Sequence, residues 1–181
     1  MPQCIMIIGG AGSGKSTLAR ELGQMLDLPV IHIDTIYWQP GWVMRSLDEI
    51  ARLTKEAADR EAWVFEGNHS HTMAYRASRA DMLIFLDIST ARRLWRIIWR
   101  IVKYHGRTRP DMGLDCPERF DWDFIKWVVD YRKNGRIRAL KFMEEAPNRL
   151  IKRHLREPRE VDAFLDSIRR ETKQKQTDHK K

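Results

Sequence analysis

The sequence predicts an α/β fold in which a five-stranded parallel sheet lies between two layers of helices. Three observations indicate this fold. Short apolar segments alternate along the 181 residues with longer segments of helical periodicity. A glycine-rich segment, 9–17, joins the first apolar segment to the first helical one. Polar residues follow directly after several apolar segments, which is where parallel sheets bind their ligands.

Five apolar segments are the expected strands. Runs of four to eight apolar residues are typical of strands that are buried on both faces, as in parallel sheets. The expected strands are 4–8, 28–33, 62–65, 82–86 and 150–155.

Three segments between these strands and one after the last strand have helical periodicity. In the first of them, Leu18, Leu22 and Leu26 recur at intervals of four residues. Residues that favour the first position of a helix precede two others, Ser46 or Asp48 for one and Ser89 or Thr90 for the next. The expected helices are 18–26, 46–60, 91–104 and 160–168.

The glycine-rich segment GGAGSGKST, Gly9–Thr17, matches the pattern G-x-x-x-x-G-K-[ST]. A loop that surrounds a polyphosphate turns its backbone N–H groups inward, and glycine permits the backbone angles that this requires. The pattern places Lys15 at the β- and γ-phosphates and the Ser16 hydroxyl on Mg²⁺. We therefore expect a P-loop NTPase fold with ATP and Mg²⁺ as cofactors. The expected nucleotide-binding residues of this loop are Gly9, Gly10, Ala11, Gly12, Ser13, Gly14, Lys15, Ser16 and Thr17.

Two carboxylates follow predicted strands at the same edge of the sheet. Asp34 could accept a proton from a hydroxyl group during phosphoryl transfer or hold Mg²⁺ through water, although aspartate also closes many strands as a turn residue. Glu66 follows an apolar strand, the usual place of a second Mg²⁺-anchoring carboxylate in P-loop proteins. Asn68 offers a donor and an acceptor to a substrate, or caps the loop. Trp38 and Trp42, close to Asp34, could line an acceptor pocket or pack locally.

Basic residues gather in and after the helix 91–104. Arg92, Arg96, Arg100 and Lys103 form one stripe with no acidic residue between them, and such a stripe favours an anionic ligand. The segment 104–113 is basic and rich in helix-breaking residues, as expected of a mobile lid. Its arginines, Arg107 and Arg109, could stabilise the phosphoryl group during transfer. The aromatic stripe of Phe120, Phe124, Trp127 and Tyr131 is expected to pack a lid helix against the body, with stacking on a base as the alternative.

The composition narrows the function further. The chain carries 33 Lys and Arg against 25 Asp and Glu, a net charge of +8, which suits a polyanionic ligand. No apolar run is long enough to span a bilayer, so we expect no membrane insertion. Cys4 and Cys116 lie far apart without metal-ligand spacing, which is typical of a reducing cytoplasm. The basic, aperiodic segment 169–181 is expected to be a disordered tail.

Over residues 3–168 the sequence resembles the adenylate-kinase-related P-loop kinases. Within them it is most similar to the group called DNA topology modulation protein, FlaR-related. The segments that carry the resemblance are Gly9–Thr17, His32–Trp38 with Pro40–Trp42, Phe65–Asn68 and Cys116–Trp122. The resemblance implies one kinase-like domain, 1–168, similar to nucleoside monophosphate kinases, with a helical lid at about 103–130.

The resemblance also assigns roles to particular residues. Adenylate kinases carry two arginines four residues apart on the helix that enters the lid, one packed on adenine and one at the phosphates. Arg96 and Arg100 match that spacing. The Asp-Gly of adenylate kinases corresponds to Glu66-Gly67, but their Phe-Pro-Arg is replaced by Asn68-His69-Ser70, which argues against AMP as the acceptor. Asp34 resembles the aspartate after the second strand in shikimate- and uridine-kinase-like enzymes, which favours a hydroxyl acceptor.

Two functions therefore remain open at the level of the sequence. The first is an ATP-dependent kinase, a monomer or weak dimer, that phosphorylates a small molecule or nucleotide. The second is a nucleic-acid-associated P-loop ATPase, which the net charge and the basic tail favour. The basic residues concentrate where a kinase needs them, which favours the first function.

Overall fold

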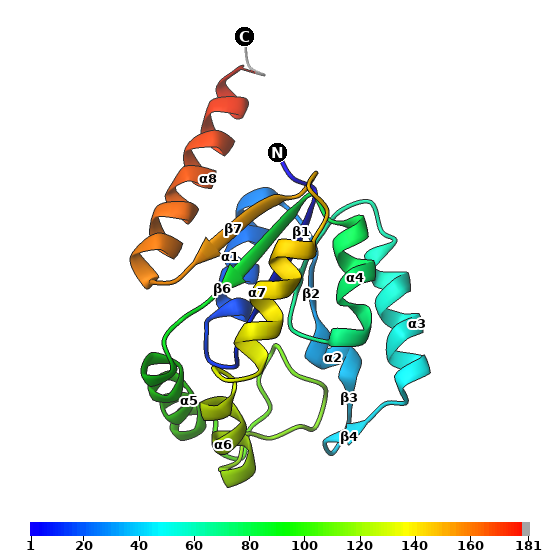
Figure 1. Cartoon of the computed structure of the whole chain (residues 1–181), viewed down its shortest axis with the longest axis vertical. Helices are drawn as coiled ribbons and strands as arrows, with labels where there is room; N and C mark the ends of the chain where they lie inside the picture. Colours follow the sequence, from blue (N-terminus) through cyan, green and yellow to red (C-terminus); the bar gives the residue numbers. More distant parts are fainter. Residues whose placement is uncertain (179–181) are drawn as a thin grey trace.

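Figure 1 shows the computed structural model of the chain, which describes residues 1–178. Five strands form one sheet in the order β2-β5-β1-β6-β7, and all the neighbouring pairs are parallel. The α/β fold with a five-stranded parallel sheet is confirmed. The strands are β1 (Cys4–Gly9), β2 (Val30–His32), β5 (Trp63–Glu66), β6 (Met82–Leu86) and β7 (Ile151–Leu155).

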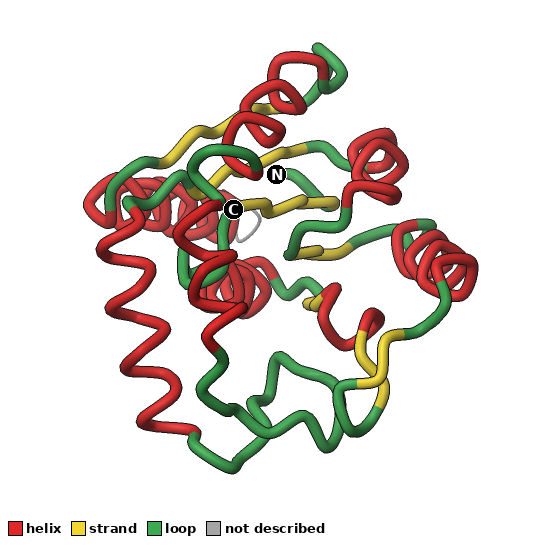
Figure 2. The backbone as a smooth tube through the Cα atoms, turned by 60° about the horizontal axis from the view of Figure 1, so that its bottom comes forward, coloured by secondary structure: helices red, strands yellow, loops and turns green. Residues whose placement is uncertain are grey.

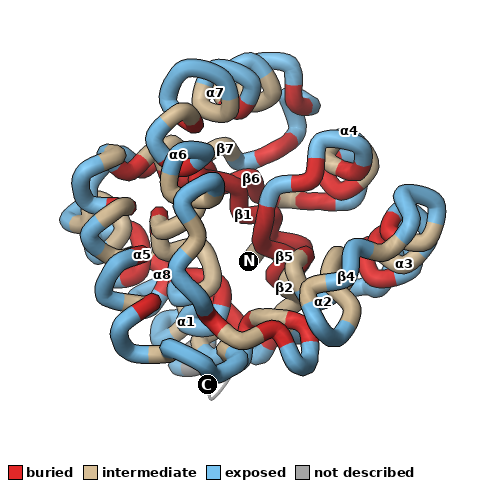
Figure 3. The backbone as a smooth tube through the Cα atoms, turned by 90° about the horizontal axis from the view of Figure 1, so that it is seen from below, coloured by how far each residue is buried: buried red, intermediate tan, exposed pale blue. Residues whose placement is uncertain are grey.

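Helices cover both faces of the sheet, because alternate side chains of the buried strands point to opposite faces. On one face, Ile5 and Ile7 of β1 pack with Leu18 of α1 (Lys15–Leu26) and Phe164 of α8 (Pro158–Asp178). On the other face, Met6 and Ile8 belong to a cluster with alanines of α3 (Leu47–Ala58), α4 (Ser70–Arg79) and α7 (Gly135–Glu145). Figure 3 shows the buried central strands β1, β5 and β6 inside a ring of partly exposed helices. The expected three layers are therefore present.

The lid region follows β6. It consists of α5 (Thr90–Tyr104), an irregular segment from 105 to 121, and α6 (Trp122–Asp130). Two isolated bridges, His105 with Glu118 and Thr108 with Pro117, hold the irregular segment together. The expected helical lid at 103–130 is therefore only partly helical.

The aromatic segment 35–42 contains regular structure that is not among the expected strands and helices. A short helix, α2 (Ile33–Tyr37), precedes a hairpin of β3 (Trp38–Gln39) and β4 (Val43–Met44). Ile33 is buried in the core, so tertiary packing holds the first turn of α2 in place.

Helix α4 is absent from the sequence prediction. Its buried side chains are Thr72, Arg76 and Ala77, so its buried stripe has little apolar periodicity to detect.

The expectation of a disordered tail from residue 169 is wrong for 169–178. Helix α8 continues ten residues past the expected end at Ile168 and reaches Asp178. Glu171, Lys173 and Lys175 are good helix formers, so these turns need no apolar face. The last three residues of the expected tail, 179–181, lie outside the described residues. None of the helices within 1–178 is long and apolar enough to cross a membrane.

Candidate active site

A cavity of about 1320 Å³ opens at the carboxyl ends of the strands. It is bounded by the glycine loop after β1, by α2, by the start of α4 and by the lid region. Of the residues that the sequence proposes for the site, all line this cavity except Gly10 and Arg107. Those that line it are Gly9, Ala11, Gly12, Ser13, Gly14, Lys15, Ser16, Thr17, Asp34, Trp38, Trp42, Glu66, Asn68, Arg96, Arg100 and Arg109.

The glycine loop has the backbone that its sequence predicts. Gly12 and Gly14 adopt φ angles of +76° and +98°, which side chains other than glycine rarely permit. Gly14 precedes α1 and offers no side-chain cap, so the first N–H groups of the helix face the cavity without a capping side chain. The Ser13 hydroxyl is buried and has no hydrogen-bond partner among the described residues. These features fit an anion such as a nucleotide phosphate.

Arg93 supports this loop from the lid helix and is absent from the sequence prediction. Its side chain is only 2% exposed. Its Nε donates to the Ala11 carbonyl at 2.9 Å, and its Nη2 donates to the Val128 carbonyl of α6 at 2.9 Å. The guanidinium also lies 4.5 Å from the centre of the Tyr131 ring. Gly10 is one of the two predicted residues outside the cavity. It packs directly against the Arg93 side chain, because a Cβ at Gly10 would lie 2.5 Å from the guanidinium carbon of Arg93.

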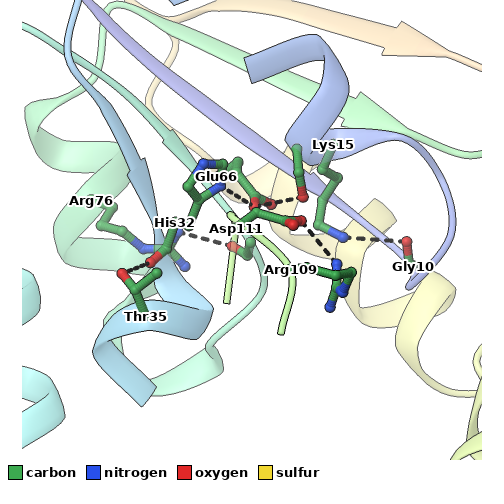
Figure 4. A network of polar contacts seen from close by, with 10 residues as sticks. Gly10, Lys15, His32, Thr35, Glu66, Arg76, Arg109 and Asp111 are labelled. Atoms are coloured by element: carbon green, nitrogen blue, oxygen red, sulfur yellow. Dashed lines mark hydrogen bonds and ion pairs between the residues drawn. The ribbon is translucent and has the colours of Figure 1, made fainter. Parts of the chain in front are cut away.

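Glu66 is the centre of a polar network beside the loop (Figure 4). The Ser16 hydroxyl donates to its Oε1 at 2.9 Å, and His32 Nδ1 lies 2.7 Å from the same oxygen. Burial by itself would raise the pKa of Glu66, but the His32 hydrogen bond and the Lys15 charge outweigh burial and lower it. The carboxylate therefore stays ionised next to the predicted Mg²⁺ ligand, Ser16. His32 is a site residue that the sequence did not single out, since histidine at the end of a strand has many roles.

Asp34 lies in the first turn of α2 and faces the cavity. Burial and the nearby Glu66 carboxylate raise its pKa, while the positive charges of Lys15 and Arg109 oppose that rise. A carboxylate with a raised pKa is a better proton acceptor than an ordinary one. The role of Asp34 as a base stays a prediction.

The lid brings two of the predicted arginines to one buried carboxylate, Glu118. Arg100 Nε lies 2.9 Å and Arg109 Nε lies 2.6 Å from Glu118 Oε1, and Glu118 is 5% exposed. The third predicted arginine, Arg107, is exposed and lies outside the cavity. Its N–H donates to the Tyr104 carbonyl and its carbonyl accepts from the Glu118 N–H, so its backbone belongs to the irregular segment.

Asp111 is a second lid carboxylate that the sequence did not single out. Arg109 Nη1 donates to its Oδ2 at 2.9 Å, as Figure 4 shows. Burial would raise the pKa of Asp111, but the Arg109 charge and the hydroxyl of Ser16 lower it. An ionised carboxylate from the lid therefore lies close to the glycine loop.

For Asn68, Trp38 and Trp42 the sequence left open whether they contact a substrate or have a local structural role. Both ends of the Asn68 amide are bonded to Gly9: Oδ1 accepts from its N–H at 3.0 Å, and Nδ2 donates to its carbonyl at 2.8 Å. Asn68 therefore supports the glycine loop, although it also borders the cavity. Trp38 and Trp42 line the cavity and pack edge to face, with ring centres 5.4 Å apart.

The aromatic stripe of the lid is only partly buried. Tyr131 is 7% exposed and Phe124 packs with the apolar cluster between α5 and α6. Phe120 and Trp127 are 51% and 53% exposed, so only half of the stripe is packed, and Phe124 packs against α5 of the lid region itself.

The residues around Glu66 fit Mg²⁺, because this ion prefers oxygen ligands. Among residues 1–178, no group of three or more His, Cys, Asp or Glu side chains forms a metal site by itself. Mg²⁺ commonly takes only one or two protein ligands together with phosphates and water. Ser16, Glu66 and Asp34 could contribute such ligands.

Comparison with known proteins places the fold. No protein-family model matches the chain. A gluconokinase from Sinorhizobium meliloti 1021 is similar in structure, with a TM-score of 0.51 and 17% identity over 94% of this chain and 89% of that one.

Two shikimate kinases are similar in the same way. The enzyme from Bacteroides thetaiotaomicron has a TM-score of 0.50 at 15% identity, over 94% of this chain and 98% of its own. The Acinetobacter baumannii enzyme, solved with shikimate, has a TM-score of 0.51 at 18% identity, over 92% of this chain and 90% of its own. The chain therefore has the fold of P-loop kinases. Its membership of the FlaR-related group stays a prediction.

Proposed function

We propose that the protein is an ATP-dependent kinase that transfers the γ-phosphoryl group of Mg·ATP to a hydroxyl group of a small molecule. The observation that carries this proposal is the position of Asp34. Its carboxylate, with a raised pKa, shares one cavity with the glycine loop and with the lid arginines. A proton acceptor, a phosphate-binding loop and nearby cations each favour phosphoryl transfer to a hydroxyl group.

The residues around the nucleotide have separate roles in this proposal. The N–H groups of Gly9–Thr17 and the ammonium group of Lys15 bind the phosphates. Arg96, which donates to the Ser13 carbonyl at 2.8 Å, lies along the loop and contacts the nucleotide. When bound at Ser16 and Glu66, Mg²⁺ neutralises negative charge on the phosphates.

The remaining residues act on the transfer itself. Asp34 accepts the proton of the acceptor hydroxyl group as that oxygen bonds to the γ-phosphorus, while the bond from the γ-phosphorus to the bridging oxygen breaks and ADP leaves. Arg100 and Arg109 stabilise the negative charge of the transferred group, an effect worth about 10³–10⁵ in rate for a well-placed arginine. The lid excludes water, so that the phosphoryl group passes to the acceptor instead of to water.

The acceptor binds on the α2 side of the cavity. Tyr37, Trp38 and Trp42 line this side, and Met73 of α4 and Met112 of the lid also face the cavity. These side chains present a mostly apolar wall around the Asp34 carboxylate. We infer that the acceptor places a hydroxyl group at Asp34 and its carbon skeleton against the aromatic rings.

The test is a screen for ATP consumption with nucleosides, nucleoside monophosphates and small polyols, in which mass spectrometry identifies the products. The Asp34→Asn variant accompanies every positive compound. We expect this variant to bind ATP with nearly normal affinity and to lose phosphoryl transfer. Equal loss of ATP binding and transfer would make Asp34 a structural or Mg²⁺ residue. ATP consumption that no compound stimulates would contradict the proposed kinase activity.

A further inference from the structure

The β3–β4 hairpin on the acceptor side contacts the lid through three hydrogen bonds. The Gly41 N–H donates to the Asp115 carbonyl at 2.8 Å. Trp42 Nε1 donates to the Pro117 carbonyl at 3.1 Å, and the Cys116 thiol donates to the Gln39 carbonyl at 3.4 Å. The two side-chain hydrogen bonds join residues that are 75 and 77 positions apart in the sequence. Figure 2 shows the long loop of the lid running towards this hairpin.

Backbone packing and backbone conformation add to these hydrogen bonds. Gly113 lies so close to the hairpin that a Cβ there would be 2.5 Å from the Trp38 carbonyl oxygen. Trp42 and Asp115 have φ angles of 62° and 51°, in the left-handed region that residues other than glycine seldom adopt. Such conformations persist where surrounding contacts hold them, so both sides of this contact are constrained by their neighbours.

The same lid segment holds the two arginines of the cavity. Glu118 follows Pro117 directly, and its carboxylate pairs with Arg100 and Arg109. Its N–H donates to the Arg107 carbonyl and its own carbonyl accepts from the Gly106 N–H, so its backbone is fixed as well. A movement of Pro117 therefore moves the carboxylate that positions both arginines.

We propose that the hairpin 38–44 and the lid segment 113–118 form a latch that couples acceptor binding to the placement of Arg100 and Arg109. This inference rests on the proposed kinase function. An acceptor that lies against Trp38 and Trp42 orders the hairpin, and the hairpin then holds Pro117 and Glu118 in position. Trp42 and Glu118 are positioning residues, because they act through the two arginines.

In this proposal the latch limits the hydrolysis of ATP in the absence of an acceptor. Without an acceptor the hairpin is less constrained, the lid opens more often and the arginines leave the phosphates. Closure that depends on the correct substrate is a known source of specificity in kinases and related enzymes.

The first test uses Trp42→Phe, which keeps an aromatic ring and removes the N–H donor. Its matched control is Trp99→Phe, because Trp99 is 60% exposed on the outer side of α5. Hydrogen exchange is followed by mass spectrometry in peptides that cover 38–44 and 105–118. Loss of one hydrogen bond should speed exchange in these peptides about fivefold in Trp42→Phe, with no change in the control.

The second test disturbs the latch without changing any side chain of the cavity wall. Gly113→Ala places a methyl group against the Trp38 carbonyl, whereas its neighbour Leu114, 80% exposed, offers Leu114→Ala as a control. We expect faster exchange in the hairpin peptide for Gly113→Ala alone. Unchanged exchange in both Trp42→Phe and Gly113→Ala would overturn the latch.

Turnover separates this inference from the proposed function. With an acceptor from the screen, both latch variants should release a larger share of the consumed ATP as free phosphate, about fivefold above the parent protein. An unchanged ratio of transfer to hydrolysis would also overturn the coupling. If exchange responds as expected but the parent protein phosphorylates no acceptor, the hairpin–lid contact stands and the proposed kinase function fails.

Discussion

The replacement of Arg93 by methionine is the most informative prediction, because it tests how the lid helix supports the nucleotide loop. Methionine keeps most of the aliphatic volume and removes the guanidinium. Two hydrogen bonds disappear, one to Ala11 and one to Val128, and both carbonyls lose a donor. The contact with the Tyr131 ring disappears as well.

The magnitude follows from these contacts. Hydrogen bonds from a charged donor contribute about 1.5–3 kcal/mol each, so two of them contribute about 3–6 kcal/mol. Part of this is offset, because burial lowers the pKa of Arg93 and so disfavours its charged form. We expect a net loss of about 2–4 kcal/mol in the free energy of unfolding, or about 5–15 °C in Tm for a chain of this size.

The assay has two parts and an adjacent control. Thermal and urea unfolding measure stability, and calorimetric titration with a nonhydrolysable ATP analogue measures binding. Arg92→Met is the control, because Arg92 is exposed one residue before Arg93. A displaced Ala11 carbonyl should weaken nucleotide binding at least about tenfold. If Arg93→Met matched Arg92→Met in both stability and affinity, the reasoning would be refuted.

Three further predictions concern charged side chains in the cavity and directly after β6. Lys15→Ala should abolish binding of the ATP analogue in the same titration, and normal affinity would refute the phosphate site. The rate of phosphoryl transfer should fall as pH drops through the raised pKa of Asp34, since only the ionised form of Asp34 accepts a proton. In Glu66→Gln this fall in rate should occur at lower pH, because the neighbouring negative charge that raises the pKa of Asp34 is gone. A fall at the same pH as in the parent protein would contradict the coupling of the two carboxylates. Burial would raise the pKa of Asp87, but hydrogen bonds from Arg136 and His154 lower it, so its contribution to stability is present above the usual pKa of aspartate and is lost as pH falls through the lowered value. Asp87→Asn should cost about 2 kcal/mol at neutral pH and less in acid, and an acid dependence of unfolding equal to that of the parent protein would contradict this.

Much of the site could be predicted from the sequence because its conformation is set locally. The glycine pattern 9–17 allows the positive φ angles of the loop, and a buried strand and an amphipathic helix on either side orient it. Asp34 and Glu66 were predictable because the ends of neighbouring parallel strands meet at one edge of the sheet. The strand positions were also predictable, because runs of apolar residues must be buried.

Other residues could not be found in this way. Arg93 is adjacent to the predicted stripe of Arg92 and Arg96, yet it is the side chain buried against the loop. Glu118 and Asp111 lie in a segment without periodicity, so no pattern indicates that they face Arg109. Arg107, which the sequence treats like Arg109, is exposed and lies outside the cavity, and no sequence pattern distinguishes the two arginines.

The sequence by itself therefore determined the fold class, the conformation of the glycine loop 9–17 and the edge of the sheet at which the cavity opens. These features follow from backbone geometry and from the burial of apolar runs, both of which act over a few neighbouring residues. Only the tertiary structure decided which charges are paired and which arginines face the cavity. Pairing depends on which side chains are desolvated together, and that is set by contacts between segments far apart in the chain, such as the hairpin 38–44 and the lid segment 113–118.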